Sequence, residues 1–290
     1  MLYIAIKSVL LYSLDTMDTQ INIKETLDWY IWAGVVETCA DEVCLNNSSE
    51  NSLFSLSVPK QPLPVTPVLE KNHISPPPVK ISSQIAAFDN VAKNARELCA
   101  KASSLTELRE LVQLFDGCNL KKTAASTVFG DGSPQARVVL IGEAPGADED
   151  RIGSPFVGKC GKLLDKMLAA INISRADCYI TNVLPWRPPG NRTPTDEEIA
   201  ICLPFLKRQI ELIKPDFLLL LGGIALKSLL DVPDSISRTR GKWLDYVIDE
   251  QKSAQVLATY HPSYLLRSPS QKAKVWSDLL RLQKKMNCEE

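Results

Sequence analysis

The chain has 290 residues, of which 45% are hydrophobic and 23% charged, and no apolar run reaches the length of a membrane-spanning helix. These values predict a soluble protein with one sizeable core and argue against a membrane protein. The eight cysteines form no CxxC pair and no disulfide-scaffold spacing, so we expect free thiols in a reducing, cytoplasmic compartment. The first 84 residues hold 5 basic and 9 acidic residues, and the rest hold 28 and 25. This balance permits nucleic-acid binding through a local patch but does not by itself argue for it.

The N-terminal part of the chain predicts little regular structure. Residues 1–14 are apolar but lack a small-residue cleavage site, so a secretory signal is not expected. A start codon placed upstream of Met17, or a terminal tail, are the alternatives. We expect residues 1–44 to be an extension with a short helix, and residues 45–82, rich in Pro and Ser, to be an extended linker. The compact domain is then expected to span 83–290.

Strand and helix patterns alternate along this domain. A continuous apolar run, which is typical of a buried parallel strand, predicts a strand at 138–142, and a second, β-rich run predicts one at 178–184. Further strands are expected at 217–221 and 256–259. Helical periodicity predicts one or two helices over 85–114 and further helices at 162–171, 195–213, 224–230 and 271–286. Ser104 with Glu107, and Thr195, supply the expected N-caps. The fold class is therefore α/β, a three-layer α/β/α domain with a four-stranded, mainly parallel sheet.

Several residues with chemical potential stand at the ends of these strands. The loop after the first strand is acidic, and because ligands bind at the carboxyl ends of strands in open α/β sheets, it is the first candidate site. Asn182 lies inside an apolar strand and needs several hydrogen-bond partners, which either a ligand pocket or a structural bridge between loops would supply. His261 directly follows the fourth strand and should face the same crevice as Glu143.

Four motifs occur in the order and at the spacing of a known family. They are Gly142-Glu-Ala-Pro-Gly146 with Glu149-Asp150, Pro155-Phe-Val-Gly158, Thr181-Asn-Val183 with Arg187-Pro-Pro-Gly-Asn-Arg-Thr-Pro194, and His261-Pro-Ser-Tyr-Leu-Leu-Arg267. From Phe115 to the last helix, the chain resembles the family 4 uracil-DNA glycosylases. The resemblance implies a uracil-DNA glycosylase-like fold, a monomeric hydrolase, and removal of uracil from damaged DNA as the first step of base excision repair.

The resemblance also implies roles at the base pocket. Phe156 would stack on a uracil flipped out of the DNA, and Asn182 would pair with its O4 and N3. His261 would donate to O2, where negative charge collects as the N-glycosidic bond breaks. The backbone of Gly142 and Ala144 would add donors.

The catalytic carboxylate is less clearly indicated by the motifs. Glu143 would position water or balance the positive charge of the sugar. Related glycosylases have Asp or Asn where this chain has Ala144, so Asp148 and Asp150 stay open as alternatives. The residues expected to contact DNA, including a wedge that holds the opened helix, are Arg187, Asn191, Arg192, Ser263, Leu265, Leu266 and Arg267.

The chain departs from the family at the cysteines. Members usually hold a [4Fe–4S] cluster with four cysteines; Cys118 and Cys202 match two positions, whereas Phe115 and Trp186 stand at the others. Since two thiolates cannot hold that cluster, we expect no cofactor and aromatic packing into the vacated space. A cluster with substitute ligands, for which Cys160 and Cys178 are the nearby choices, is the alternative.

Two other functions compete with uracil excision. The motifs could persist in a non-catalytic DNA-binding or polymerase-associated module, or serve a glycosylase for hypoxanthine or mismatched thymine. Asn182, Phe156 and His261 together favour uracil excision, because a protein that only binds DNA needs no donor to a leaving group.

Overall fold

The structure is a computed structural model that describes residues 81–288. The helix expected within residues 1–44, and all but the end of the expected 45–82 linker, lie outside the described residues. The expected start of the compact domain near residue 83 falls within the first described helix, α3 (Ile81–Lys101). Among the described helices, none is both long and apolar enough to cross a membrane.

A six-stranded sheet forms the centre of the domain, in the order β1-β3-β2-β4-β6-β5. The strands are β1 (Asp131–Gly132), β2 (Val138–Gly142), β3 (Cys178–Asn182), β4 (Phe217–Leu221), β5 (Trp243–Val247) and β6 (Ser253–Thr259). The four predicted strands are the parallel ones, β3-β2-β4-β6. The prediction of four strands was incomplete, because β1 and β5 add antiparallel edges. A two-residue strand leaves no pattern in a sequence, and β5 is half-buried or exposed rather than continuously apolar.

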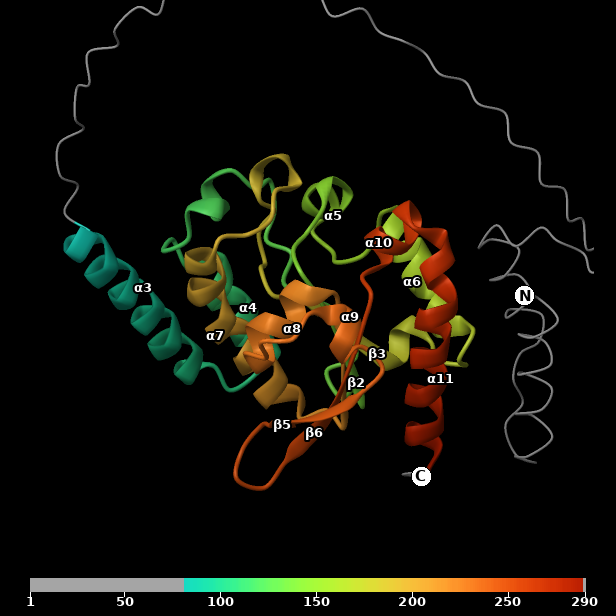
Figure 1. The fold of residues 1–290 in the computed structure, drawn as a ribbon. Coiled ribbons are helices and arrows are strands. Elements are labelled where there is room, and N and C mark those ends of the chain that lie inside the picture. The colour runs from blue at the N-terminus through green and yellow to red at the C-terminus, as the bar shows by residue number, and fades with distance from the viewer. Residues whose placement is uncertain (1–80, 289–290) are drawn as a thin grey trace, which may run out of the picture.

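Helices cover both faces of the sheet, which makes the three layers visible in Figure 1. Because successive side chains of a strand point to opposite faces, each strand feeds two cores. In β2, Val139 and Ile141 pack with α3, α4 (Leu105–Leu114), α7 (Asp196–Ile213) and α8 (Gly223–Leu230). Val138 and Leu140 pack with α6 (Lys159–Ala169) and α11 (Lys272–Cys288) on the other face. Apolar residues on both faces explain why the central strands read as continuous apolar runs.

The longer helices agree with the predicted ones. They are α4 (Leu105–Leu114), α6 (Lys159–Ala169), α7 (Asp196–Ile213), α8 (Gly223–Leu230) and α11 (Lys272–Cys288). The Ser104 side chain accepts from the Glu107 amide, and Thr195 forms a full capping box with Glu198. The sequence did not predict α5 (Ala147–Ile152), α9 (Ile236–Thr239) and α10 (Pro262–Arg267). Helices of four to six residues are too short to show a periodic pattern.

Candidate functional site

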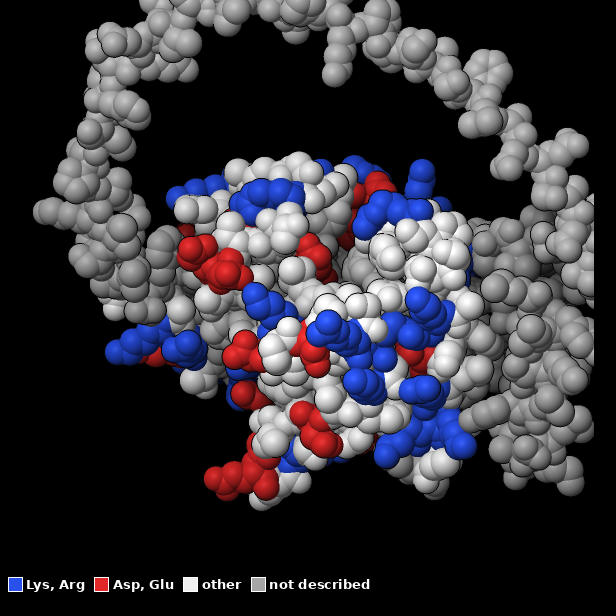
Figure 2. Space-filling model, in the orientation of Figure 1, with Lys and Arg blue, Asp and Glu red and all other residues white. Residues whose placement is uncertain are grey.

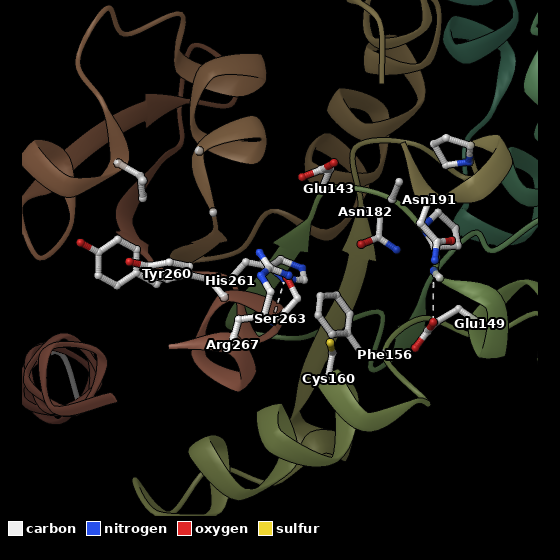
Figure 3. Close-up of a pocket in the computed structure, with 18 of the residues that line it drawn as sticks. Glu143, Glu149, Phe156, Cys160, Asn182, Asn191, Tyr260, His261, Ser263 and Arg267 are labelled. Carbon is white, nitrogen blue, oxygen red and sulfur yellow. Dashed lines mark hydrogen bonds between the residues drawn. The ribbon is translucent and has the colours of Figure 1, made fainter. Parts of the chain in front are cut away.

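A cavity of about 620 Å³ opens at the carboxyl ends of the parallel strands. Segments that follow β2, β3, β4 and β6 line it, which confirms that the residues at these strand ends come together. Its walls include Glu143, Ala144, Glu149, Phe156, Asn182, Asn191, Arg192, Gly222, Tyr260, His261, Ser263 and Arg267. Figure 3 shows the side chains of Phe156, Asn182 and His261 around one space, with Glu143 nearby.

Asn182 presents an unsatisfied acceptor to this cavity. It is the last residue of β3, in register with Gly142, the last residue of β2. Its Oδ1 is buried and has no hydrogen-bond partner among the described residues. A Cβ at Gly142 would lie 2.4 Å from that oxygen and 2.6 Å from the Phe156 ring. Gly142 therefore leaves room for both side chains. An unpaired buried acceptor costs about 1–3 kcal/mol, which a ligand with a matching donor would offset.

Phe156 is held in an unusual backbone conformation. Its φ is 51°, in the left-handed region that residues with a Cβ rarely adopt. A Cβ at Gly161 would lie only 1.7 Å from the Phe156 carbonyl oxygen, so α6 approaches this loop through a glycine. The ring lies 5.6 Å from the His261 ring, centroid to centroid.

Two charged side chains hold the backbone of the Phe156 loop, one through its amides and the other through its carbonyls. Glu149 accepts through Oε1 from the amides of Val157 and Gly158, at 3.0 and 2.9 Å. Arg175 donates to the carbonyls of Pro155 and Phe156, at 2.6 and 3.1 Å. Hydrogen bonds to charged groups are worth about 1.5–3 kcal/mol each, enough to hold one residue in the left-handed region.

His261 has a defined tautomer in this structure. It is the N-cap of α10, and its Nδ1 accepts from the backbone amide of Ser263 at 3.1 Å. An Nδ1 that accepts carries no proton, so the neutral ring carries its proton on Nε2. Burial, and then the charge of Arg267, lower the pKa of His261 to about 4. At neutral pH the site therefore offers a neutral imidazole with a single N–H donor.

The three candidate carboxylates lie in different environments. Glu143 lines the cavity, and burial raises its pKa. Asp150 instead accepts from the amides of Ala125 and Ser126, at 2.8 and 3.1 Å, and ties α5 to that loop. Asp148 is exposed and lies 3.5 Å from Arg151. Neither Asp148 nor Asp150 is among the residues that line the cavity, so the geometry favours Glu143.

The expected DNA contacts divide between the rim and the core. Asn191, Arg192, Ser263 and Arg267 line the cavity, and Arg187 donates to Asn191 at 2.7 Å. Leu265, however, is fully buried in the core beside α6 and α11. The expected contact of Leu265 with DNA is therefore wrong, because its side chain cannot reach the surface. Leu266 is 37% exposed and is the residue available as a wedge.

Sequence reasoning missed several residues of the site. Glu149 lines the cavity, although its motif predicts no separate role for it, and no motif includes Arg175. Glu149 stands three residues after the N-cap Gly146 and also accepts from its amide at 3.1 Å. That spacing is a recognisable capping signal. Arg175 lies far from Phe156 in the sequence, and no local pattern indicates their contact.

Comparison with known proteins identifies the family. The family model described as the Uracil DNA glycosylase superfamily matches residues 129–280, about half of the chain. The chain belongs to this superfamily. It is 44% identical over 184 residues to the type-4 uracil-DNA glycosylase of Archaeoglobus fulgidus, and the aligned region covers 62% of this chain and 92% of that protein. It is also 44% identical to the type-4 enzyme of Thermotoga maritima, over 56% of this chain and 82% of that protein. Identity to the type-4 enzyme of Pyrobaculum aerophilum is 38%, over 60% and 91%.

The described residues do not fit the [4Fe–4S] cluster that the family 4 glycosylase resemblance implies. Cys118 and Cys202 are buried with their sulfurs 3.9 Å apart, and a hydrogen bond between the two thiols, with burial, raises the pKa of Cys202. At the other two positions, Phe115 and Trp186 are 4% and 1% exposed. Within the described part of the chain, no three His, Cys, Asp or Glu side chains group as metal ligands. An aromatic ring cannot ligate iron, so Phe115 and Trp186 cannot supply the two ligands that such a cluster needs beyond Cys118 and Cys202.

Aromatic packing occupies this region of the superfamily fold instead. The Phe115 ring meets Phe205 of α7 edge to face, with centroids 5.1 Å apart. Trp186 donates through Nε1 to Thr127 Oγ1 at 3.0 Å. Both aromatics belong to the same buried cluster as Cys118 and Cys202. These contacts agree with the expected packing and leave the two thiols inside an apolar core.

Proposed function

We propose that this chain is a uracil-DNA glycosylase, a hydrolase that cleaves the N-glycosidic bond of uracil flipped out of DNA and so initiates base excision repair. Its type-4 relatives are named for this activity. The partner is DNA that contains uracil. We further propose that the protein is a cytoplasmic monomer; its six described cysteines are free, as expected in a reducing compartment.

The observation that supports uracil best is the orphan Oδ1 of Asn182 beside the Phe156 ring. Uracil presents an N3–H donor next to its O4 acceptor. The Asn182 amide would accept from N3–H and donate to O4, while the ring of Phe156 stacks on the base. Cytosine reverses both groups, since its N3 accepts and its exocyclic amine donates. The cavity would therefore reject it.

His261 would stabilise the leaving group. As the bond between C1′ of the sugar and N1 of the base breaks, the electron pair moves onto the base and negative charge collects at O2. The neutral Nε2–H of His261 would donate to that oxygen. A ring whose Nδ1 is held by the Ser263 amide needs no reorganisation during this step.

Glu143 would serve the other half of the reaction. The oxygen of a water molecule bonds to C1′, and its proton passes to the Glu143 carboxylate. Burial raises the pKa of this carboxyl, which makes it a better base than an exposed glutamate. The same carboxylate would balance the positive charge that develops on the sugar.

Replacing Asn182 by aspartate tests the recognition step. Asn182→Asp should slow uracil excision, because an ionised carboxylate has no N–H to give to O4 and repels it. Where the carboxyl is neutral, it should permit some cleavage of cytosine. The measurement is strand cleavage by alkali after incubation with oligonucleotides that contain uracil or cytosine.

Asn119→Asp is the matched control, because Asn119 is exposed and does not line the cavity. It should behave as the wild type. Unchanged uracil excision by Asn182→Asp would show that Asn182 is structural. Parallel oligonucleotides with hypoxanthine or mismatched thymine test the alternative substrates, and cleavage of none of the four would leave only a DNA-binding role.

Arg175 offers a second test, because it holds the Phe156 loop without lining the cavity. Arg175→Ala should lower kcat/KM for uracil excision about 10-fold or more, as expected when hydrogen bonds worth about 1.5–3 kcal/mol are lost. Arg175→Lys should recover part of the loss. Arg151→Ala, which removes an exposed arginine of α5, is the control and should keep the wild-type value. Equal kcat/KM in Arg175→Ala and the wild type would contradict the clamp.

A further inference from the structure

A basic surface lies beside the candidate active site and is not part of it. The last helix, α11, places Lys274, Arg281 and Lys285 on one face, since they are seven and eleven residues apart. Across from them, the segment between α9 and β5 supplies Arg240 and Lys242. We call these five residues the α11 basic surface. Figure 2 shows Lys and Arg side chains gathered over α11 and its neighbours.

A hollow of about 300 Å³ lies within this surface. Arg240, Lys274 and Arg281 line it, together with Gly241 and Ser277. Backbone carbonyls orient both guanidinium groups, because Arg240 donates to the carbonyl of Lys274 and Arg281 donates to that of Gly241. Oriented guanidinium groups around a small hollow are suited to the oxygens of a phosphate group.

The lining of this hollow has more basic than acidic side chains. The only acidic residue of α11 is Asp278, which is 1% exposed. Its carboxylate is already bonded to Arg240, at 2.7 and 3.0 Å, and to the Thr259 hydroxyl at 2.6 Å. Three basic side chains, of Arg240, Lys274 and Arg281, therefore line a hollow whose one acidic residue is the buried Asp278. Such an excess attracts a polyanion.

The chain connects this surface directly to the cavity. Ser237 and Arg267 line the cavity, while Arg240 follows Ser237 in the next turn and α11 begins five residues after Arg267. Thr259, which bonds to Asp278, is two residues before His261. Arg240 also lies over the ring of Tyr260, which lines the cavity, at 5.5 Å from the ring centroid, so the surface and the cavity are adjacent.

We propose that the α11 basic surface binds the phosphate backbone of DNA outside the flipped nucleotide. The proposal rests on the proposed function, because it assigns the polyanion as the same DNA. Along the α11 axis, Lys274 lies about 10 Å from Arg281 and about 16 Å from Lys285. These separations correspond to roughly three to five nucleotides of a strand that rises 3.4 Å per residue. A second contact on the same polymer raises affinity without touching the base.

Charge reversal tests the proposal. The double variant Lys242→Glu/Lys274→Glu changes two exposed residues that do not line the cavity. Its affinity for uracil-free duplex DNA should fall about 10-fold or more at low salt. Since each phosphate contact contributes about 0.9 to the slope of log affinity against log salt, that slope should fall by about 2. At saturating enzyme, single-turnover excision of uracil should keep its wild-type rate.

The matched control is Lys93→Glu/Lys207→Glu, on α3 and α7, which changes the net charge by the same amount. It should keep most of the affinity and the slope. Equal losses in both double variants, or unchanged DNA affinity in Lys242→Glu/Lys274→Glu, would overturn the proposal, and the latter would indicate another acidic partner. Binding to uracil-free DNA is measured without any excision. A protein that loses DNA affinity as expected but releases no uracil would refute the proposed function alone.

Discussion

His261→Ala should excise uracil about 10²–10³ times more slowly than the wild type in single-turnover reactions, with nearly unchanged affinity for DNA. This is the usual effect of removing one preorganised donor to a developing anion, about 2.7–4 kcal/mol. The neutral Nε2–H of His261 lies in the wall of the cavity and is oriented by the Ser263 amide. His261→Gln keeps an N–H donor on a side chain of similar reach, so it should recover part of the rate.

The pH dependence of the excision rate and of stability tests the role of His261 in a second way. A pKa of about 4 means that the ring stays neutral from pH 8 down to about pH 5, so His261 should cause no change in rate over this range. The unfolded chain takes up a proton near pH 6.5, before the folded one does. The His261 contribution to stability should therefore decrease as the pH falls from about 6.5 towards 4. A wild-type rate in His261→Ala, or a rate that falls as the pH rises through 6.5, would contradict the assignment.

Trp186→Ala should lower the free energy of unfolding by about 3–5 kcal/mol, the range for truncation of a buried aromatic side chain. Trp186 is 1% exposed and belongs to the cluster that holds Cys118 and Cys202. Urea denaturation measures the change. If packing rather than coordination stabilises this region, Cys118→Ser should cost much less than Trp186→Ala. The anaerobically purified wild type should also be colourless and active without iron.

Iron and sulfide analysis of the purified protein tests whether a cluster is present. About four irons per chain would show that the chain holds a cluster after all, with ligands beyond Cys118 and Cys202. Equal destabilisation by Trp186→Ala and Leu114→Ala would also contradict the packing argument, since Leu114 is 75% exposed. The two measurements are independent, because one reports composition and the other stability.

The sequence predicted the centre of the fold well. The central strands β2 and β4 are buried on both faces, so each appears as an uninterrupted apolar run that ends in a turn. The capping residues Ser104 and Thr195 marked helix starts that the structure confirms. The edge strand β5 was missed because its half-exposed residues form no such run. The short helix α10 was missed because one and a half turns show no periodicity.

The candidate site was predictable where function depends on a residue at the end of a strand. Glu143, Asn182 and His261 follow or end parallel strands, and parallel strands end at one edge of a sheet. The supporting contacts were not predictable. Arg175 reaches the Phe156 loop through the tertiary fold, and the burial of Leu265 depends on how α10 packs on α6. Neither leaves a local trace in the sequence.

The register between β2 and β3 has a consequence for fidelity. Gly142 and Asn182 are paired across the main-chain ladder at the ends of two central strands. The distance between the Asn182 amide and Gly142 is thus set by the hydrogen-bonded pairing of two central strands, whereas Leu266, Arg187 and Arg192 lie outside the sheet on helix ends and loops. Warming should weaken the contacts to the opened duplex well before it reduces the discrimination between uracil and cytosine. The enzyme should lose speed before it loses accuracy.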